Sequence, residues 1–81
     1  MQFAYSERFL AALEDAPPAV PKAFFKQLGF LAENVRHPSL RAKKVEDGRE
    51  LRQARVNRDW RFYFTIEDDV CRLLDIIAHP K

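Results

Sequence analysis

The run Trp60-Arg61-Phe62-Tyr63-Phe64-Thr65-Ile66 indicates the fold more clearly than any other part of the sequence. Its large apolar side chains alternate with Arg61, Tyr63 and Thr65, which is the period of a half-buried strand. Successive strand side chains point to opposite faces of a sheet, so one face here packs on a core and the other displays Arg61 and Tyr63. Trp60 has the parity of the core face, although an exposed ring in this place would also stack on a nucleobase.

Two further stretches of predicted strand flank this run. After the polar turn Glu67-Asp68-Asp69, residues 70–78 place apolar side chains on both faces of a strand, which is typical of a central strand. On the other side, the chain beyond Ser39 also alternates, with a break at Glu46-Asp47-Gly48 that predicts a turn between short strands. The C-terminal half is therefore expected to form most of a sheet.

The N-terminal half predicts one short strand and two helices. Residues 2–5 alternate, and Ser6 is suited to cap a helix that ends before Pro17-Pro18. A second, longer helix starts near Pro18 and closes at His37-Pro38. The apolar stripe of the first helix is Phe9, Leu10 and Leu13, and that of the second is Val20, Phe24, Leu28, Leu31 and Val35.

The order of strand, helix, helix and then further strands predicts an α+β fold, βααβββ. We expect two N-terminal helices on one face of a mostly antiparallel, four-stranded sheet, in a single domain covering residues 1–81. The other face of the sheet stays open. Strand alternation puts Arg55 and Arg61 there, so we expect the chemistry of the protein on this open face.

Composition excludes several classes of function. The lone Cys71 cannot form an internal disulfide and fits a small core residue, and no Cys or His cluster has metal-ligand spacing. The two glycines, Gly29 and Gly48, cannot build a phosphate-cradling loop, and no common catalytic motif occurs. No run is apolar enough to span a membrane, and the N-terminus lacks the pattern of a signal peptide. We therefore expect a cytoplasmic protein that uses neither a metal nor an organic cofactor.

The net charge of +2 is unevenly distributed along the chain. Residues 36–61 hold nine Lys or Arg against four Asp or Glu, a local charge of +5, which leaves −3 on the remainder. Such segregation is typical of phosphate binding, because each neutralised phosphate releases condensed counterions. A solvated charged surface is the alternative, and charge alone does not separate the two.

The cationic segment supplies candidate residues for binding RNA and for cleaving it. Guanidinium and ammonium groups suit phosphate oxygens, and an aromatic ring beside them can orient a base. His79 follows the last strand, where an imidazole is either a surface tail residue or a general acid for a leaving oxygen. The candidate catalytic residues are Arg55, Arg61 and His79, and the candidate RNA-binding residues are Arg41, Lys43, Lys44, Arg52, Arg58 and Tyr63.

Three segments together resemble the RelE/ParE superfamily of toxins. They are His37-Pro38-Ser39-Leu40-Arg41-Ala42-Lys43-Lys44, Arg55-Val56-Asn57-Arg58-Asp59-Trp60-Arg61-Phe62-Tyr63-Phe64 and His79-Pro80-Lys81. The resemblance spans nearly the whole chain and implies a microbial-RNase-like fold and the toxin of a type II toxin–antitoxin pair. In the RelE branch it implies cleavage of mRNA in the ribosomal A site.

The resemblance also implies roles for individual residues. In the RelE branch, the 2′-hydroxyl of the RNA attacks the adjacent phosphorus. Arg61 matches the central arginine, which stabilises charge on the scissile phosphate, and Arg55 resembles a second phosphate-binding position. Lys43 and Lys44 look like the lysine-bearing loop of this branch, and His79 resembles the general acid that some members use.

Three functions remain open on these residues. A ribosome-dependent mRNA endonuclease fits the basic open face and is the leading hypothesis, although no general base is identified and Glu46 and Glu50 only lie near the site. A ParE-like inhibitor of DNA gyrase fits the same fold, and so does a member that only binds RNA or its antitoxin. The expected partners are the ribosome with its mRNA and a small antitoxin whose C-terminal segment covers the cationic face.

Overall fold

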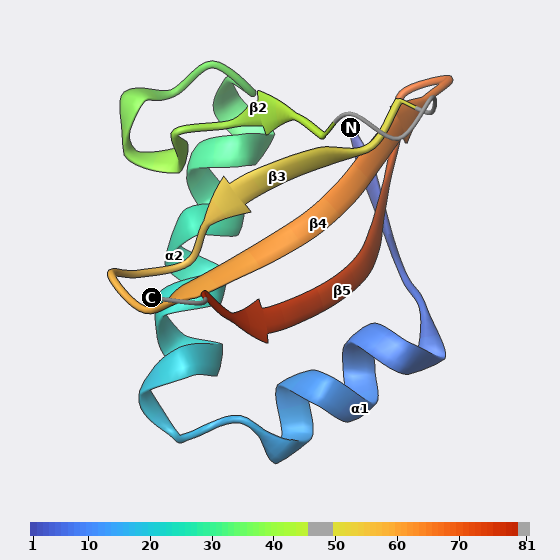
Figure 1. Cartoon of the computed structure of the whole chain (residues 1–81). Helices are drawn as coiled ribbons and strands as arrows, with labels where there is room; N and C mark the ends of the chain where they lie inside the picture. Colours follow the sequence, from blue (N-terminus) through green and yellow to red (C-terminus); the bar gives the residue numbers. More distant parts are fainter. Residues whose placement is uncertain (46–49, 80–81) are drawn as a thin grey trace.

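The structure, a computed structural model, describes residues 1–45 and 50–79. A strand and two helices are followed by a short 3-10 helix and then by the remaining strands (Figure 1). Within the described ranges, neither α-helix has the length and apolar character needed to cross a bilayer. The elements are β1 Gln2–Tyr5, α1 Glu7–Asp15, α2 Ala19–Glu33, the 3-10 helix η1 Pro38–Leu40, β2 Lys43–Lys44, β3 Arg52–Arg55, β4 Trp60–Glu67 and β5 Val70–Ala78.

The strands of the described residues form a mixed sheet in the order β1-β5-β4-β3-β2. β1 runs parallel to β5, and the other neighbouring strands are antiparallel. β5 is internal to the sheet, as its apolar residues predict. The predicted α+β class is confirmed, and β2, with two residues, adds a fifth strand to the four expected. The predicted turn at Glu46-Asp47-Gly48 lies outside the described residues.

The β4–β5 hairpin turns through Asp68 and Asp69, whose φ angles are 51° and 64°. Positive φ at both central residues is the backbone of a type I′ turn, whose twist matches that of the flanking strands. Aspartate tolerates this left-handed conformation better than bulky residues do. The acidic turn predicted from the sequence therefore has the backbone that a two-residue hairpin requires.

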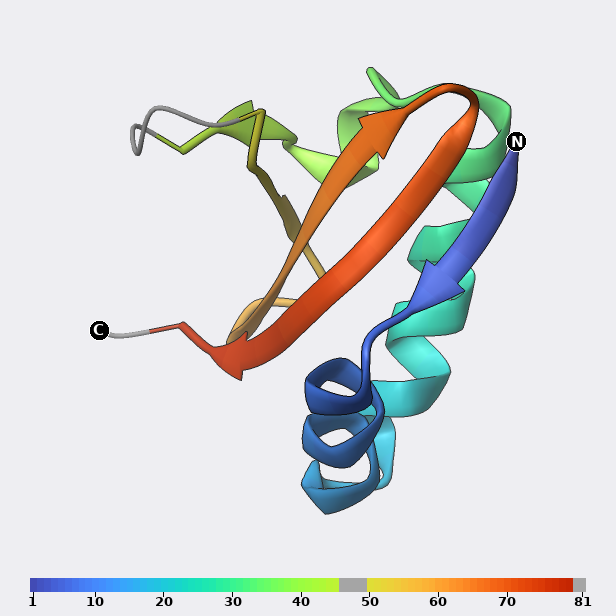
Figure 2. The same cartoon turned by 90° about the vertical axis from the view of Figure 1, so that its right-hand side faces the viewer.

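The core lies between one face of the sheet and the helices. Phe62 and Phe64 of β4 are fully buried, as the alternation predicts, and the ring of Phe24 in α2 meets that of Phe62 edge-on at 5.3 Å. Figure 2 shows α2 along this side of the sheet and α1 beside β5. Trp60 is half-buried against the core and Cys71 is buried in it. The helices thus cover one face, and the opposite face of the sheet stays open.

Most residues of the predicted apolar stripes are buried or half-buried, with three differences. α2 ends at Glu33 and not at His37-Pro38, because Asn34 has an extended backbone, so Val35 lies beyond the helix. Leu10 of α1 is 50% exposed, so its predicted place in the stripe is wrong, and the neighbouring Phe9 turns to the core instead. On α2, the buried position between Phe24 and Leu31 belongs to Gln27, which is 5% exposed. A buried amide requires hydrogen-bond partners, so Gln27 marks a place where α2 is tied to other elements.

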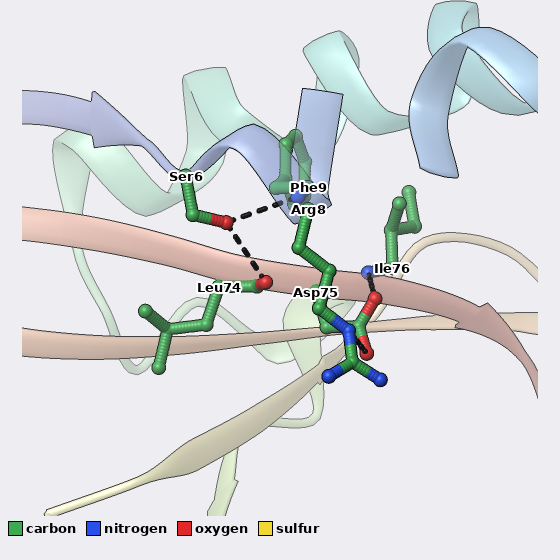
Figure 3. Close-up of polar contacts among 6 residues, drawn as sticks. All are labelled: Ser6, Arg8, Phe9, Leu74, Asp75 and Ile76. Atoms are coloured by element: carbon green, nitrogen blue, oxygen red, sulfur yellow. Dashed lines mark hydrogen bonds and ion pairs between the residues drawn. The ribbon is translucent and has the colours of Figure 1, made fainter. Parts of the chain in front are cut away.

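Ser6 caps α1 and ties it to the sheet (Figure 3). Its Oγ accepts a hydrogen bond from the Phe9 N–H at 3.0 Å and donates one to the Leu74 carbonyl at 3.0 Å. The first bond satisfies one of the N–H groups that a helix start leaves unpaired, and it confirms the predicted cap. Leu74 is the extra residue of a β-bulge, where the register between β4 and β5 shifts. Ser6 therefore fastens the start of α1 to this bulge.

Candidate nucleic-acid interface

Arg55 of β3 and Arg61 of β4 lie directly opposite each other. The adjacent pair, Ala54 and Phe62, is buried toward the helices, so alternation points both arginines to the open face. Like charges in this position repel each other. The ion pairs within the described residues involve neither arginine. The pair is therefore suited to share an anion such as a phosphate.

The β3–β4 turn fixes the side chain of Arg61. Its Nη1 donates to the carbonyl oxygens of Asn57 at 2.7 Å and Trp60 at 2.9 Å. Across the described residues, the Nε and Nη2 donors of Arg61 have no protein acceptor. A guanidinium presents its donors as a rigid planar fork, so the edge that the turn does not use remains available to an anion.

His79 lies at the same end of the sheet as the arginine pair. Its backbone N–H donates to the Asp59 carbonyl, in the β3–β4 turn, at 2.6 Å. His79 is exposed, and alternation from Ile77, the strand partner of Arg61, puts its imidazole on the open face. The structure thus brings together Arg55, Arg61 and His79, the three residues predicted to be catalytic.

Tyr63 is near the middle of the open face. Gln53 donates from Nε2 to the Tyr63 hydroxyl at 2.9 Å, which holds the half-buried ring in place. Lys43 is the strand partner of Gln53 and shares this face. A hollow of about 360 Å³ is lined by Lys43, Lys44, Val45, Gln53 and Tyr63. A ring beside a cationic hollow has the arrangement needed to stack a base next to a bound phosphate.

The other residues predicted to bind RNA are not gathered on the open face. Arg52 and its strand partner Lys44 have the opposite parity to Arg55, and Lys44 forms an ion pair with Glu50 at 3.3 Å. Arg58 is exposed in the β3–β4 turn. Arg41 follows η1 and lines a separate hollow against α2.

Neither carboxylate considered as a general base is placed in the site. Glu50 is exposed and held by Lys44, and Glu46 lies outside the described residues. Over residues 1–45 and 50–79, no group of three or more His, Cys, Asp or Glu side chains is arranged to hold a metal ion. Among the residues predicted for the site, the His79 imidazole and the Tyr63 hydroxyl are the groups that can exchange a proton.

The structure adds one carboxylate, Asp75, which is the strand partner of Tyr63. Its Oδ2 pairs with the Arg8 Nε at 3.2 Å, and its Oδ1 accepts a hydrogen bond from the Ile76 N–H at 2.9 Å (Figure 3). The pair with Arg8 neutralises a negative charge that would otherwise oppose a phosphate on this face. An aspartate in a strand whose other residues are apolar except Arg72 was the available signal for it.

An apolar hollow of about 360 Å³ lies beside Tyr63 on the same face. Its lining includes Leu51, Leu74 and Ile77, and Ile77 is 37% exposed. The bulge in β5 contributes to this surface, because a bulge redirects the side chains on either side of it. The open face therefore has an apolar part next to its cationic part.

Solved structures of toxins and toxin complexes share this fold. The archaeal RelE–RelB complex from Pyrococcus horikoshii OT3 matches with a TM-score of 0.77 and 21% identity, over 95% of this chain and 92% of that chain. The YoeB/ParE toxin from Agrobacterium tumefaciens matches with a TM-score of 0.83 and 7% identity, over 99% and 100%. The E. coli DinJ–YafQ toxin–antitoxin complex matches with a TM-score of 0.70 and 17% identity, over 96% and 91%.

These matches confirm the RelE-like fold that the sequence predicts. They cover nearly the whole of each chain, and the likeness is one of structure, since at most 21% of residues are identical among them. No protein-family model and no curated protein matches the sequence.

Proposed function

We propose that this chain is the toxin of a type II toxin–antitoxin pair, and that it cleaves mRNA on cytoplasmic ribosomes. The observation that carries the proposal is the pair Arg55 and Arg61 on an open sheet face, with no ion-pair partner among the described residues and with His79 at the same end. The fold shared with the YoeB/ParE toxin and with the toxin–antitoxin complex supports the toxin role.

In the proposed reaction the 2′-oxygen of one nucleotide attacks the adjacent phosphorus. The O2′–P bond forms as the P–O5′ bond breaks, which leaves a 2′,3′-cyclic phosphate and a 5′-hydroxyl. The proton of the 2′-hydroxyl passes to solvent water, and His79 gives a proton to the departing 5′-oxygen. Arg55 and Arg61 bind the nonbridging phosphate oxygens, whose negative charge increases in the transition state.

Single-turnover cleavage of a reporter mRNA on translating ribosomes tests this proposal. Arg61→Gln should slow cleavage about 10²–10³-fold, because a donor aimed at developing charge contributes that much. His79→Gln should slow it about 10²–10⁴-fold, through loss of the general acid. Arg72→Gln is the matched control, since Arg72 is an exposed cation of β5 at the other end of the β4–β5 pair.

Three outcomes of this assay are informative. Cuts with 5′-hydroxyl ends that depend on Arg61 and His79 support the proposal. Undiminished cutting by folded Arg61→Gln and His79→Gln variants means that the site lies elsewhere. RNA that is bound but never cut leaves this chain as a binding protein only.

A ParE-like inhibitor of DNA gyrase is the second candidate function, and the apolar hollow beside Tyr63 favours it. Apolar side chains at the surface, such as the exposed Ile77 and the half-buried Leu74, suit a protein surface better than they suit a polynucleotide backbone. A gyrase supercoiling assay beside the translation assay separates the two functions. Inhibition of supercoiling without mRNA cuts would establish the gyrase function.

We propose a small antitoxin as the partner, with a segment that covers the cationic part of the open face. The RelE–RelB and DinJ–YafQ structures, both complexes, support a partner of this kind. Co-purification with the protein encoded beside this chain tests the partnership. Chemical footprinting of Arg55, Arg61 and His79 in the complex then tests the covering, which fails if their reactivity does not change.

A further inference from the structure

A second cationic surface lies away from the open face, behind the end of β3. A hollow of about 530 Å³ is bounded by α2, by η1 with the residue after it, and by the end of β3 with its turn. A volume of this size accommodates a nucleotide-sized ligand. The residues of the hollow that matter here are Lys26, Gln27, Ser39, Arg41, Arg55 and Asn57.

The hollow is positively charged, and the described residues that line it include no Asp or Glu. Lys26 and Arg41 supply its cations, and none of the ion pairs between described residues uses them. Uncompensated cations in a concave surface concentrate the positive potential there. The lining contains no aromatic ring, so it offers phosphate contacts without a platform for a base.

The side chain of Gln27 holds the walls of the hollow together. Its Nε2 donates to the Ser39 carbonyl at 2.9 Å and to the Arg55 carbonyl at 2.8 Å, while its Oε1 accepts from the Ser39 Oγ at 3.0 Å. One buried amide thus joins α2 to η1 and to the end of β3. Walls that are fixed before binding reduce the entropy lost when a ligand binds.

Arg41 is the C-cap of η1 and ends it in a left-handed conformation. Arg41 has φ 48° and ψ 43°, the left-handed region that residues other than glycine seldom occupy. Such strain is found at ligand-binding positions more often than elsewhere. Here it occurs at a cation that lines the hollow.

We infer that the hollow binds a backbone phosphate of the RNA strand whose scissile phosphate lies between Arg55 and Arg61. This inference rests on the proposed function. Arg55 borders both surfaces, because its side chain has the parity of the open face and its carbonyl is part of the wall that Gln27 holds. Among the described residues, β2 pairs with Arg52 and Gln53, and the buried Gln27 amide occupies the edge of β3 at the Arg55 carbonyl. The strand passes around this edge, and its recognition in the hollow does not depend on base identity.

Binding of single-stranded RNA, measured by fluorescence anisotropy at low salt, tests the inference. The probes are a trinucleotide and a strand of about ten nucleotides, which is within the site size of single-strand binders. Lys26→Gln combined with Arg41→Asn removes two cations of the hollow, and asparagine tolerates the left-handed backbone. Lys22→Gln is the matched control, because Lys22 is exposed on α2 and does not line the hollow.

The double variant should bind the longer strand about tenfold more weakly, with a salt dependence lowered by about 0.7 in slope, and the trinucleotide as before. Arg61→Gln should weaken both strands. Equal binding of the longer strand by the double variant and the native chain would overturn the inference while the proposed function stands. If two trinucleotides bind per chain and the longer strand binds no more tightly than one of them, a single strand does not contact both surfaces, and the inference is overturned.

Cleavage is measured separately, so the two proposals fail in different ways. If the longer strand needs Lys26 and Arg41 for binding but is never cut, the proposed cleavage is refuted, while the binding of a backbone phosphate in the hollow is supported. A native chain that binds neither strand refutes both. Melting temperatures of all variants confirm that each is folded.

Discussion

Replacing Gln27 with leucine removes the amide that joins α2, η1 and β3 while it keeps a side chain of similar length. The change removes three hydrogen bonds and leaves the carbonyl groups of Ser39 and Arg55 and the hydroxyl of Ser39 without this partner. A buried polar group left unpaired costs about 1–3 kcal/mol. Ser39 is exposed, so water can replace part of the hydrogen bonding that it loses. The unpaired Arg55 carbonyl therefore accounts for most of the loss of stability. We expect the free energy of unfolding to fall by about 2–3 kcal/mol.

Urea and thermal denaturation followed by circular dichroism measure this effect. For a domain of this size, 1 kcal/mol corresponds to roughly 4–8 °C in melting temperature, so Gln27→Leu should melt about 10–20 °C lower. The urea midpoint should fall while the slope of the transition is unchanged, because the loss is confined to the native state.

A double-mutant cycle with Ser39→Ala isolates the side-chain bond. Residues that share a hydrogen bond have interaction energies of about 0.5–3 kcal/mol, so Gln27→Leu should cost less in the Ser39→Ala background than in the native chain. The explanation fails if Gln27→Leu is within about 0.5 kcal/mol of the native chain, the usual range of an inconsequential surface change. Additive losses in the cycle would show that the Ser39 hydroxyl does not contribute.

Two further predictions concern the helix cap and the buried thiol. Ser6→Ala should lower the free energy of unfolding by about 1–2 kcal/mol, because α1 loses its cap and the Leu74 carbonyl loses its donor. Ser6→Thr, which keeps the hydroxyl, should retain most of the native stability in urea denaturation. A Ser6→Ala variant as stable as the native chain would contradict the capping role of Ser6. Burial raises the pKa of Cys71 from 9.0 to about 11, so the stability linked to the neutral thiol is complete below pH 9 and lost as pH rises through 11. Between pH 9 and 11 the free energy of unfolding of the native chain should therefore fall relative to that of Cys71→Ala. A difference between the two that does not change with pH would contradict the raised pKa.

Features of the fold that depend on local periodicity were predictable from the sequence. The alternation of residues 60–66 gave the buried and open faces of β4, and Ser6 indicated the start of α1. Periodicity did not decide which of Phe9 and Leu10 is exposed. Adjacent residues of a helix cannot both face the core, and each of these two lies three or four residues from Leu13. The bulge at Leu74 was not predictable either, because it is a property of the register between two strands.

In the candidate site, too, the features that depend on local sequence were predictable and those that depend on the path of the chain were not. Arg55 and Arg61 share a face because a short turn joins their strands, and the hairpin register is a local property. The position of Arg41 depends on the path of the chain after η1, and no glycine or asparagine signals its left-handed backbone. Gln27 did leave a signal, as a polar residue three positions after Phe24 on the buried side of α2. Its partners could be identified only from the structure.

The cationic features of this chain weaken the free domain in two ways that one kind of ligand relieves. Arg55 and Arg61 repel each other across β3 and β4, at a cost on the order of 1 kcal/mol, and the left-handed backbone at Arg41 costs about 1–2 kcal/mol more. For a domain whose total stability is roughly 0.05–0.15 kcal/mol per residue, these losses are substantial. A polyanion that binds the folded chain neutralises the arginine pair and offsets the strain through contacts with Arg41. If the proposed function holds, folding and phosphate binding are coupled, which would explain why cations that have no acidic partner among the described residues persist on so small a domain.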